Sequence, residues 1–199
     1  PEKFDLRDSF SALLKGKYLN PSEHRGVSHT IYRQSSRNED FELVSIEKDK
    51  INTFLTALKA KENIKNLVCI GIGGSRVGPE LLVEFVNKNE PLSIFFCSSY
   101  DLLELKNTLQ KCYQMETIVV VSSKSFSTDE TIKNLNMIKA WFDEKPEINP
   151  EDHIYGVSSD KERMKAFGIK EDHQFEILDS LGGRFSVWSS MSIPAFVNA

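Results

Sequence analysis

The sequence lacks several features that would set it apart from ordinary globular proteins. No run of about 18 apolar residues occurs, which excludes a transmembrane helix. Residues 1–15 mix charges with short apolar stretches, unlike a secretory signal peptide. The chain has 25 Lys and Arg against 29 Asp and Glu, and their scatter gives no basic stripe for nucleic acid. We therefore expect neither a membrane nor a nucleic-acid partner.

Cysteine is also scarce. Cys69, Cys97 and Cys112 are odd in number, show no Cys-x-x-Cys spacing, and the first two lie inside apolar runs. This pattern is typical of reduced structural thiols in a cytoplasmic protein. None of the four histidines stands at metal-ligand spacing from another His, a Cys or a carboxylate, so we expect no metal site.

The two ends of the chain also lack ordinary boundaries. The sequence begins with Pro1 rather than Met, and it stops at Ala199 directly after an apolar run over residues 191–197. We expect it to be part of a longer protein. Its 199 residues, 40% of them hydrophobic, are still enough to bury one core without disulfides or metal.

What the sequence does contain is a regular alternation of apolar strands and amphipathic helices. Five runs rich in Val, Ile and Phe read as strands buried on both faces: residues 67–72, 92–97, 117–121, 153–157 and 175–178. Helical patterns lie before and between them: residues 48–61, 78–87, 101–111, 129–142 and 161–167. This order predicts right-handed βαβ units and a doubly wound α/β domain with a parallel sheet of about five strands. Ligands of such sheets bind beyond the carboxyl ends of the strands, so the loops there are the candidate sites.

The first of these loops is rich in glycine. Residues 71–75 read Gly-Ile-Gly-Gly-Ser, and such glycines let the backbone approach an anion with free N–H groups. The run is not a dinucleotide fingerprint, because Arg76 stands where the third glycine is required, and it is not a P-loop. A tight turn without a ligand explains the glycines equally well. Pro79 suits the first turn of the helix that follows.

The loop after the third strand carries six hydroxyl residues and a lysine over residues 122–131. Hydroxyls beside the free N–H groups of a helix N-terminus make a phosphate cradle, and without glycines the side chains must do much of the binding. Helix capping is the alternative, because Ser127 and Glu130 match the Ser-x-x-Glu capping box. Capping accounts for Glu130 but leaves the other hydroxyls unexplained.

The loop after the fifth strand places an arginine behind two glycines, Gly182 and Gly183. The guanidinium of Arg184 is a fixed cationic fork that suits an oxyanion or phosphate, although a lone surface arginine would have the same local sequence. Three such loops at one sheet edge together indicate a small, phosphorylated, hydroxyl-rich ligand.

In order and spacing, these motifs resemble the N-terminal part of the glucose-6-phosphate isomerase family. The resemblance rests on residues 71–75, 123–128 and 182–189, and on an earlier stretch from Asn20 to Arg33 that includes His29. It covers residues 18 to 196. It implies a sugar-isomerase (SIS) domain, a flavodoxin-like doubly wound sheet, over residues 46–199. A helical arm over residues 1–45 precedes it, and the family's second SIS domain and C-terminal helices lie beyond this chain.

The resemblance also implies an activity. The family is a cytoplasmic, homodimeric aldose–ketose isomerase that interconverts glucose 6-phosphate and fructose 6-phosphate in glycolysis and gluconeogenesis. It works through a cis-enediol and needs neither metal nor organic cofactor. Its phosphate loop carries over onto Ser123, Lys124 (mainly through its backbone), Ser125 and Thr128, with Phe126 and Ser127 completing the loop. Gly74 and Ser75 are expected near the sugar, and Arg184 is expected to face the reacting carbons and to stabilise the developing negative charge.

The resemblance leaves the acid–base groups outside this sequence. The family's glutamate base, histidine and lysine lie later in its chain, so we expect this chain alone to bind phosphate weakly and to turn nothing over. A non-catalytic SIS module that binds a sugar phosphate to regulate a partner is the alternative, and a SIS isomerase or lyase for another sugar phosphate is a weaker one. The chain departs from the family's usual sequence at three positions that bear on substrate details. Arg76 replaces the usual Asp, Phe185 replaces Tyr, and Pro194 is expected to disturb a helix.

Overall fold

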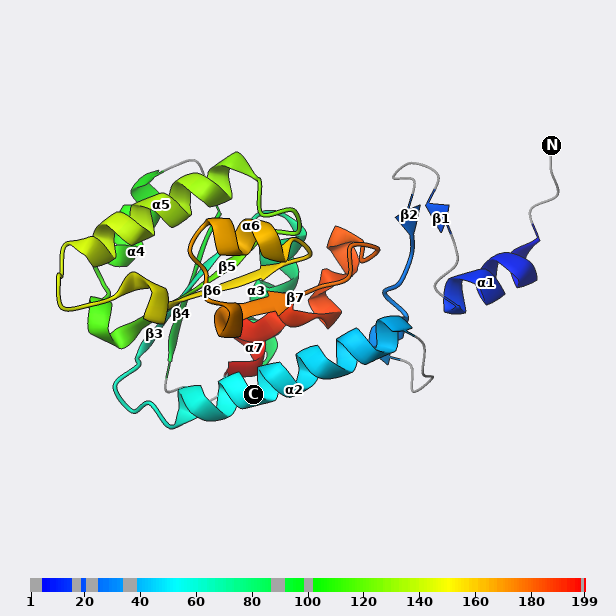
Figure 1. The fold of residues 1–199 in the computed structure, drawn as a ribbon, viewed down its shortest axis with the longest axis horizontal. Helices are drawn as coiled ribbons and strands as arrows, with labels where there is room; N and C mark the ends of the chain where they lie inside the picture. The colour runs from blue at the N-terminus through cyan, green and yellow to red at the C-terminus, as the bar shows by residue number, and fades with distance from the viewer. Residues whose placement is uncertain are drawn as a thin grey trace.

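A five-stranded parallel sheet forms the centre of the molecule (Figure 1). The computed structural model describes residues 5–15, 19–20, 25–33, 39–86, 92–98, 102–197 and 199. The strands are β3 (Asn66–Ile70), β4 (Ser93–Cys97), β5 (Thr117–Ser122), β6 (Ile154–Ser158) and β7 (Gln174–Glu176). Their order, β4-β3-β5-β6-β7, confirms the predicted doubly wound α/β fold.

The strand sequences explain their places in the sheet. Every residue of β3, β5 and β6 is buried, as the continuous apolar runs predicted, whereas β4 at one edge is half-exposed over most of its length. Ile70 pairs with Cys97 on one side and with Val121 on the other. The carboxyl ends of β3, β4 and β5 therefore lie level, and the loops that follow them meet at one edge.

Helices cover both faces of the sheet. They are α2 (Glu39–Lys59), α3 (Gly74–Val86), α4 (Leu102–Leu109), α5 (Asp129–Asp143), α6 (Lys161–Ala166) and α7 (Ile193–Val197). One core cluster joins α2 and α7 to the sheet, with α3 packed against α7, and the other joins α4, α5 and α6 to the opposite face. Short 3-10 helices lie between these elements: η1 (Ile31–Arg33), η2 (Gln114–Glu116), η3 (Pro150–Asp152), η4 (Glu171–His173), η5 (Gly183–Trp188) and η6 (Ser190–Ser192).

Two expectations about prolines are wrong. Helix α3 begins at Gly74, so Pro79 lies inside the helix rather than in its first turn. The proline is tolerated there because only the carbonyl of Ser75, one turn earlier, loses a backbone donor. Pro194 does not disturb a helix, because α7 begins at Ile193 and the proline occupies its first turn, where no N–H is required.

The N-terminal arm extends away from the α/β domain (Figure 1). Its elements are α1 (Leu6–Leu14), capped by the side chain of Asp5, and the short antiparallel pair β1 (Leu19–Asn20) and β2 (Arg25–Gly26). Residues 21–24 of the early motif lie outside the described residues. The expected boundary at residue 45 falls inside α2, and the division of the chain there stays a prediction.

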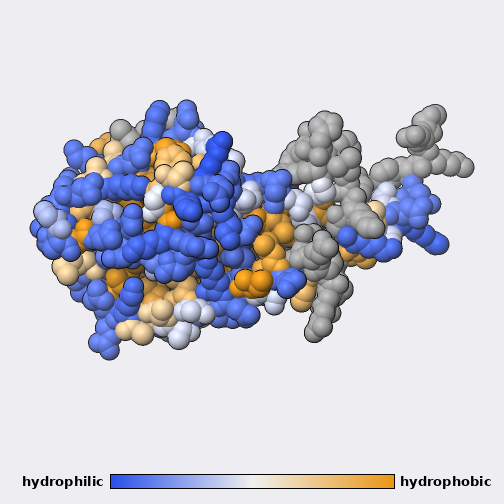
Figure 2. Space-filling model, in the orientation of Figure 1, coloured by the Kyte–Doolittle hydropathy of each residue, from blue (hydrophilic) through white to orange (hydrophobic). Residues whose placement is uncertain are grey.

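The surface of the α/β domain is largely hydrophilic. Figure 2 shows charged and polar residues over most of the visible face, with hydrophobic residues gathered where the domain meets the arm. No helix in the described part of the chain is long and apolar enough to cross a lipid bilayer.

Candidate functional site

A polar cavity of about 210 Å³ opens at the carboxyl edge of the sheet. Its walls come from the loops after β3 and β5 and from the start of η5: Ile72, Gly74, Ser75, Ser122, Ser123, Lys124, Ser125, Thr128, Thr131 and Gly183. The chain leaves β3 towards β4 and returns across the sheet to β5, so these two loops diverge at the switch point of the strand order. Open α/β sheets bind their ligands at that point.

The hydroxyl loop after β5 is held in an unusual backbone conformation. A turn closes where the N–H of Phe126 donates to the carbonyl oxygen of Ser123 at 3.2 Å. Phe126 has a φ of 46°, a left-handed value that bulky side chains rarely adopt and that costs about 1–3 kcal/mol. Its ring is fully buried in the core beside α5, and this burial holds the loop in place.

The carbonyl of Lys124 anchors the same loop to the end of β6. Its oxygen accepts hydrogen bonds from the hydroxyls of Ser158 and Ser159, at 2.8 and 2.9 Å, and from the backbone N–H of Ser159 at 3.0 Å. The Lys124 ammonium donates to the carbonyl of Asp179 and pairs with its carboxylate at 3.3 Å. The carbonyl and the ammonium of Lys124 are thus engaged by residues that do not line the cavity, which leaves its backbone N–H for a ligand.

Two residues of the cavity wall carry free backbone N–H groups. In the described part of the chain, the backbone N–H groups of Lys124 and Ser125 have no protein acceptor. Helix α5 starts directly behind them, and its N-cap residue is Thr128, which makes no side-chain capping hydrogen bond. The capping box expected at Ser127 and Glu130 is therefore wrong: the helix begins one residue later than that motif requires. The exposed amides and the helix dipole together favour an anion here.

Hydroxyl groups supply the rest of the polar lining. The oxygens of Ser123 and Thr128 lie 3.3 Å apart, and those of Ser125 and Ser127 lie 2.7 Å apart. Among the described residues that line the cavity there is no carboxylate or imidazole, and the one cationic side chain, that of Lys124, pairs with Asp179. These residues can therefore bind an anion through neutral donors, but none of them is a general base.

Two glycine turns meet at the cavity rim. A Cβ added to Gly74 would lie 2.2 Å from the carbonyl oxygen of Gly183, so only glycine fits at position 74. The hydroxyl of Ser186 bridges both turns, 2.7 Å from the carbonyl oxygen of Gly183 and 3.3 Å from that of Gly74. This contact brings the neighbouring Arg184 to the rim of the site.

The earlier motif also reaches this region. The ring of His29 stacks on Phe185 with centroids 4.0 Å apart and planes 14° apart. The hydroxyl of Ser180 donates to that of Ser28 at 2.6 Å. The arm thus contacts the loop that carries Arg184.

The structure brings six of the nine predicted site residues to the cavity wall: Gly74, Ser75, Ser123, Lys124, Ser125 and Thr128. The other three lie elsewhere. Phe126 is buried in the core, Ser127 is exposed and lines a neighbouring hollow together with Phe126, and Arg184 is exposed and follows the wall residue Gly183 in the chain. Among the described residues, Arg184 has no ion-pair or hydrogen-bond partner, so its guanidinium is available to a ligand.

Sequence reasoning did not assign four residues that line the cavity: Ile72, Ser122, Thr131 and Gly183. Each lies within three residues of a predicted one. Ser122 ends β5, and Thr131 stands in the first turn of α5, so both belong to the hydroxyl loop already singled out. Ser122 and Thr131 could have been found from their hydroxyls and Gly183 from its glycine turn, whereas Ile72 had only its place in the loop.

Larger hollows lie away from this edge. A groove of about 640 Å³ runs between α4 and α5, and one of about 460 Å³ lies beside the end of α2. Both are lined mainly by aliphatic or aromatic side chains and by the stems of lysines, without converging N–H or hydroxyl groups. The smaller cavity at the strand ends is the better candidate because it combines donors with the switch point. No group of three or more metal-ligating side chains was found among the described residues.

Comparison with known proteins agrees with this geometry. The family model for phosphoglucose isomerase matches residues 1–199. The chain belongs to the phosphoglucose isomerase family. Curated relatives named glucose-6-phosphate isomerase include those of Paraburkholderia phymatum, 34% identical over 92% of this chain, and Burkholderia multivorans, 32% identical over 94%. A crystal structure of a glucose-6-phosphate isomerase from Chlamydia trachomatis superimposes with a TM-score of 0.78 at 26% identity, over 93% of this chain.

This phosphoglucose isomerase family chain spans about a third of its relatives. It covers 36% and 37% of the two bacterial proteins and 38% of the Chlamydia chain. A hypothetical protein from Thermus thermophilus shares the fold, with a TM-score of 0.63 at 21% identity over 96% of this chain and 46% of that one.

Proposed function

We propose that this cavity binds the phosphate of glucose 6-phosphate and fructose 6-phosphate for an aldose–ketose isomerase. The observation that carries the proposal is the convergence of unpaired N–H groups and hydroxyls at the N-terminus of α5, in a cavity shared with two glycine turns. A phosphate dianion needs several donors, and here neutral donors supply them.

The sugar extends from that phosphate towards the glycine turns. Gly74 and Ser75 form the opposite wall, and Arg184 stands beside Gly183 at the rim. Isomerisation moves a proton from C2 to C1 through a cis-enediol, and negative charge develops on oxygen during the transfer. A guanidinium at the rim stabilises that charge more in the transition state than in the ground state. Arg184 is the residue we assign to this task.

The base that moves the proton is not assigned to any residue of this chain. None of the described residues of the cavity wall carries a carboxylate or an imidazole. Glu130 stands in the first turn of α5 but does not line the cavity. We propose that the glutamate, histidine and lysine of the reaction belong to the remaining two thirds of the family's length. The complete protein would act as a cytoplasmic homodimer in glycolysis and gluconeogenesis.

The same free amides and hydroxyls at the start of α5 also fit a second candidate. A non-catalytic SIS module would bind a sugar phosphate through the same donors and pass the signal to a partner. The two functions differ at Arg184, which an enediol-forming enzyme needs and a sensor does not. Turnover by the complete protein would decide between them, because a sensor binds sugar phosphate without isomerising it.

The binding proposal is tested by titrating this chain with 6-phosphogluconate and with inorganic phosphate, followed by calorimetry or by NMR shifts. Ser125→Ala and Thr128→Ala remove cavity hydroxyls, and each should weaken 6-phosphogluconate binding by roughly tenfold, the effect of losing one hydrogen bond to a charged group. Ser93→Ala is the matched control, because Ser93 is exposed at the start of β4, at the opposite edge of the sheet. Unchanged affinity in both cavity variants would show that the phosphate binds elsewhere.

A further inference from the structure

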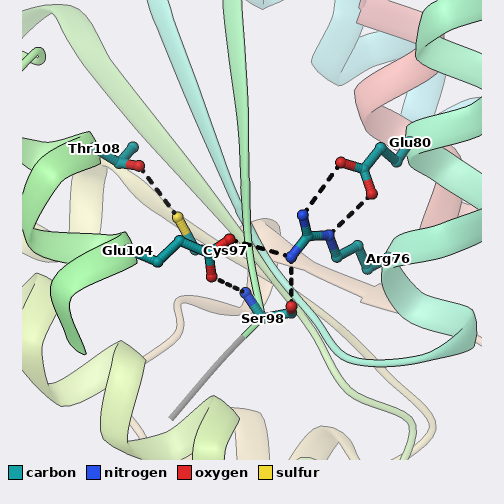
Figure 3. A network of polar contacts seen from close by, with 6 residues as sticks. All are labelled: Arg76, Glu80, Cys97, Ser98, Glu104 and Thr108. Carbon is teal, nitrogen blue, oxygen red and sulfur yellow. Dashed lines mark hydrogen bonds and ion pairs between the residues drawn. The ribbon is translucent and has the colours of Figure 1, made fainter. Parts of the chain in front are cut away.

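Arg76 ties three elements together beside the cavity (Figure 3). Its guanidinium donates two hydrogen bonds to the carboxylate of Glu80, one turn along α3: Nε lies 2.9 Å from Oε2, and a second nitrogen lies 3.3 Å from Oε1. A third nitrogen donates both to the hydroxyl of Ser98 and to Oε1 of Glu104, the latter at 3.3 Å. The paired geometry with Glu80, assisted by Glu104, raises the pKa of Arg76 above its already high value.

Two of these partners belong to the next βα unit. Ser98 follows the last residue of β4, and Glu104 lies in the first turn of α4. The backbone N–H of Ser98 donates to Oε2 of Glu104 at 3.1 Å, so serine, glutamate and arginine close a ring of contacts. The N–H of Gly71 donates to the carbonyl of Cys97 at 3.3 Å, which brings the turns after β3 and β4 side by side.

This network leaves Arg76 little capacity for a ligand. A guanidinium has five N–H donors, and four hydrogen bonds to Glu80, Ser98 and Glu104 are formed. Two carboxylates neutralise its charge, and Arg76 does not line the cavity. The arginine that replaces the family's usual Asp therefore does not add a cation to the site.

Its position in the chain gives it another role. Arg76 directly follows Ser75, and both lie in the first turn of α3, which forms the wall opposite the hydroxyl loop. The first residue of that turn, Gly74, packs on Gly183, which precedes Arg184. A shift of the start of α3 would thus move the Gly74–Ser75 wall and, through Gly183, the turn of Arg184, whereas the hydroxyl loop is anchored separately, through the Lys124 carbonyl, to the end of β6.

We propose that Arg76 is a positioning residue that fixes the Gly74–Ser75 wall and, through Gly183, the Arg184 turn for the sugar part of the ligand. This inference rests on the proposed function of the cavity. Without the guanidinium, the carboxylates of Glu80 and Glu104 would face each other without a counter-charge, and their repulsion would push α3 and α4 apart.

The experiment compares two ligands on this chain. Arg76→Met and Arg76→Lys are titrated with glucose 6-phosphate and with inorganic phosphate, alongside Lys65→Met. Lys65 is the matched control because it forms an exposed ion pair with Glu116, at 2.8 Å, at the opposite edge of the sheet. We expect Arg76→Met to weaken glucose 6-phosphate binding by roughly tenfold and inorganic phosphate binding by less than about twofold. Arg76→Lys keeps the charge but loses the paired N–H donors of the guanidinium. Its glucose 6-phosphate affinity should therefore lie between those of Arg76→Met and the wild-type chain.

The possible outcomes distinguish the positioning role of Arg76 from the proposed binding function of the cavity. Equal losses for both ligands would mean a general structural role and would overturn the positioning role, as would affinities that match those of Lys65→Met. If Arg76→Met fails to fold, Arg76→Lys provides the test: it should lose more affinity for glucose 6-phosphate than for inorganic phosphate. A wild-type chain that binds neither ligand would instead overturn the proposed function, and with it the inference.

Discussion

Gly74 and Gly183 lie in backbone contact, so close that a Cβ on Gly74 would stand 2.2 Å from the carbonyl oxygen of Gly183. The two residues begin different elements, Gly74 the helix α3 and Gly183 the 3-10 helix η5, and the contact brings the predicted sugar wall to the turn that carries the predicted arginine. Gly183 itself has open space where a Cβ would be. This asymmetry makes a direct test possible.

Gly74→Ala should destabilise the fold by about 1–3 kcal/mol, because rigid backbone rather than a flexible side chain must move to admit the methyl group. Gly183→Ala changes the same number of atoms at the same contact and should cost much less. Chemical denaturation of both variants measures the difference. Comparable losses of unfolding free energy would contradict the close approach of the two turns.

Phe126→Ala should reduce both stability and phosphate affinity. Removing a fully buried ring costs about 3–5 kcal/mol, and it also releases the residue whose left-handed backbone shapes the hydroxyl loop. Phe142→Ala, a substitution of an equally buried ring near the end of α5, should cost similar stability but leave phosphate affinity unchanged in the folded fraction. Denaturation curves and phosphate titrations below the unfolding transition separate the two effects. If both variants lost affinity alike, Phe126 would have no special role in the loop.

Glu47→Gln should change how stability depends on pH. Glu47 is buried on α2, and this burial raises the pKa of its carboxyl to about 7, although the N–H of Glu176, donating at 2.9 Å, opposes the shift. Between pH 4.5 and 7 the folded protein holds a proton that the unfolded chain releases, so unfolding free energy falls as pH rises through this window and then levels off.

The glutamine variant carries no titrating carboxyl at this position and still offers an oxygen to Glu176. At pH 8 it should be more stable than the wild-type chain by about 1–3 kcal/mol, and at pH 4 it should be nearly equal. Thermal melts across this pH range provide the measurement. Glu42→Gln removes the same charge from an exposed position on α2 and should not reproduce the pattern. If the unfolding free energies of the wild type and Glu47→Gln differed by the same amount at every pH, the raised pKa of Glu47 would be contradicted.

Arg184→Ala tests catalysis in a protein that carries the complete family length. Because the guanidinium acts on charge that develops during the reaction, the substitution should lower kcat by on the order of a hundredfold and leave KM within a few-fold. Steady-state kinetics in both reaction directions measures the separate effects on kcat and on KM. A variant with an unchanged kcat and a raised KM would make Arg184 a ground-state binding residue.

Local sequence patterns were enough to predict the sheet. The Val- and Ile-rich segments that became β3 and β5 are buried on both faces, and this burial produces the continuous apolar runs that identify them. The hydroxyl loop was also predictable, because its residues are consecutive and end at a helix. Four predicted residues of this loop, Ser123, Lys124, Ser125 and Thr128, line one cavity for this reason.

What the sequence could not predict depends on contacts between distant segments. Local preference favoured a helix starting near Pro79, but packing of Gly74 on Gly183 starts α3 earlier. The Lys124 ammonium is engaged by Asp179, which lies in another loop and does not line the cavity. Arg76 reads as an isolated charge in the sequence, and its partners Ser98 and Glu104 come from the next βα unit.

The three donors on the Lys124 carbonyl have a consequence for the thermodynamics of binding. Because Ser158 and Ser159 fix that peptide during folding, the loop gives up its conformational entropy before any ligand arrives. A phosphate then meets donors that are already oriented, and its affinity is not reduced by the cost of ordering a flexible segment. Such a loop should admit its ligand at a rate limited by diffusion and dehydration rather than by rearrangement of the protein.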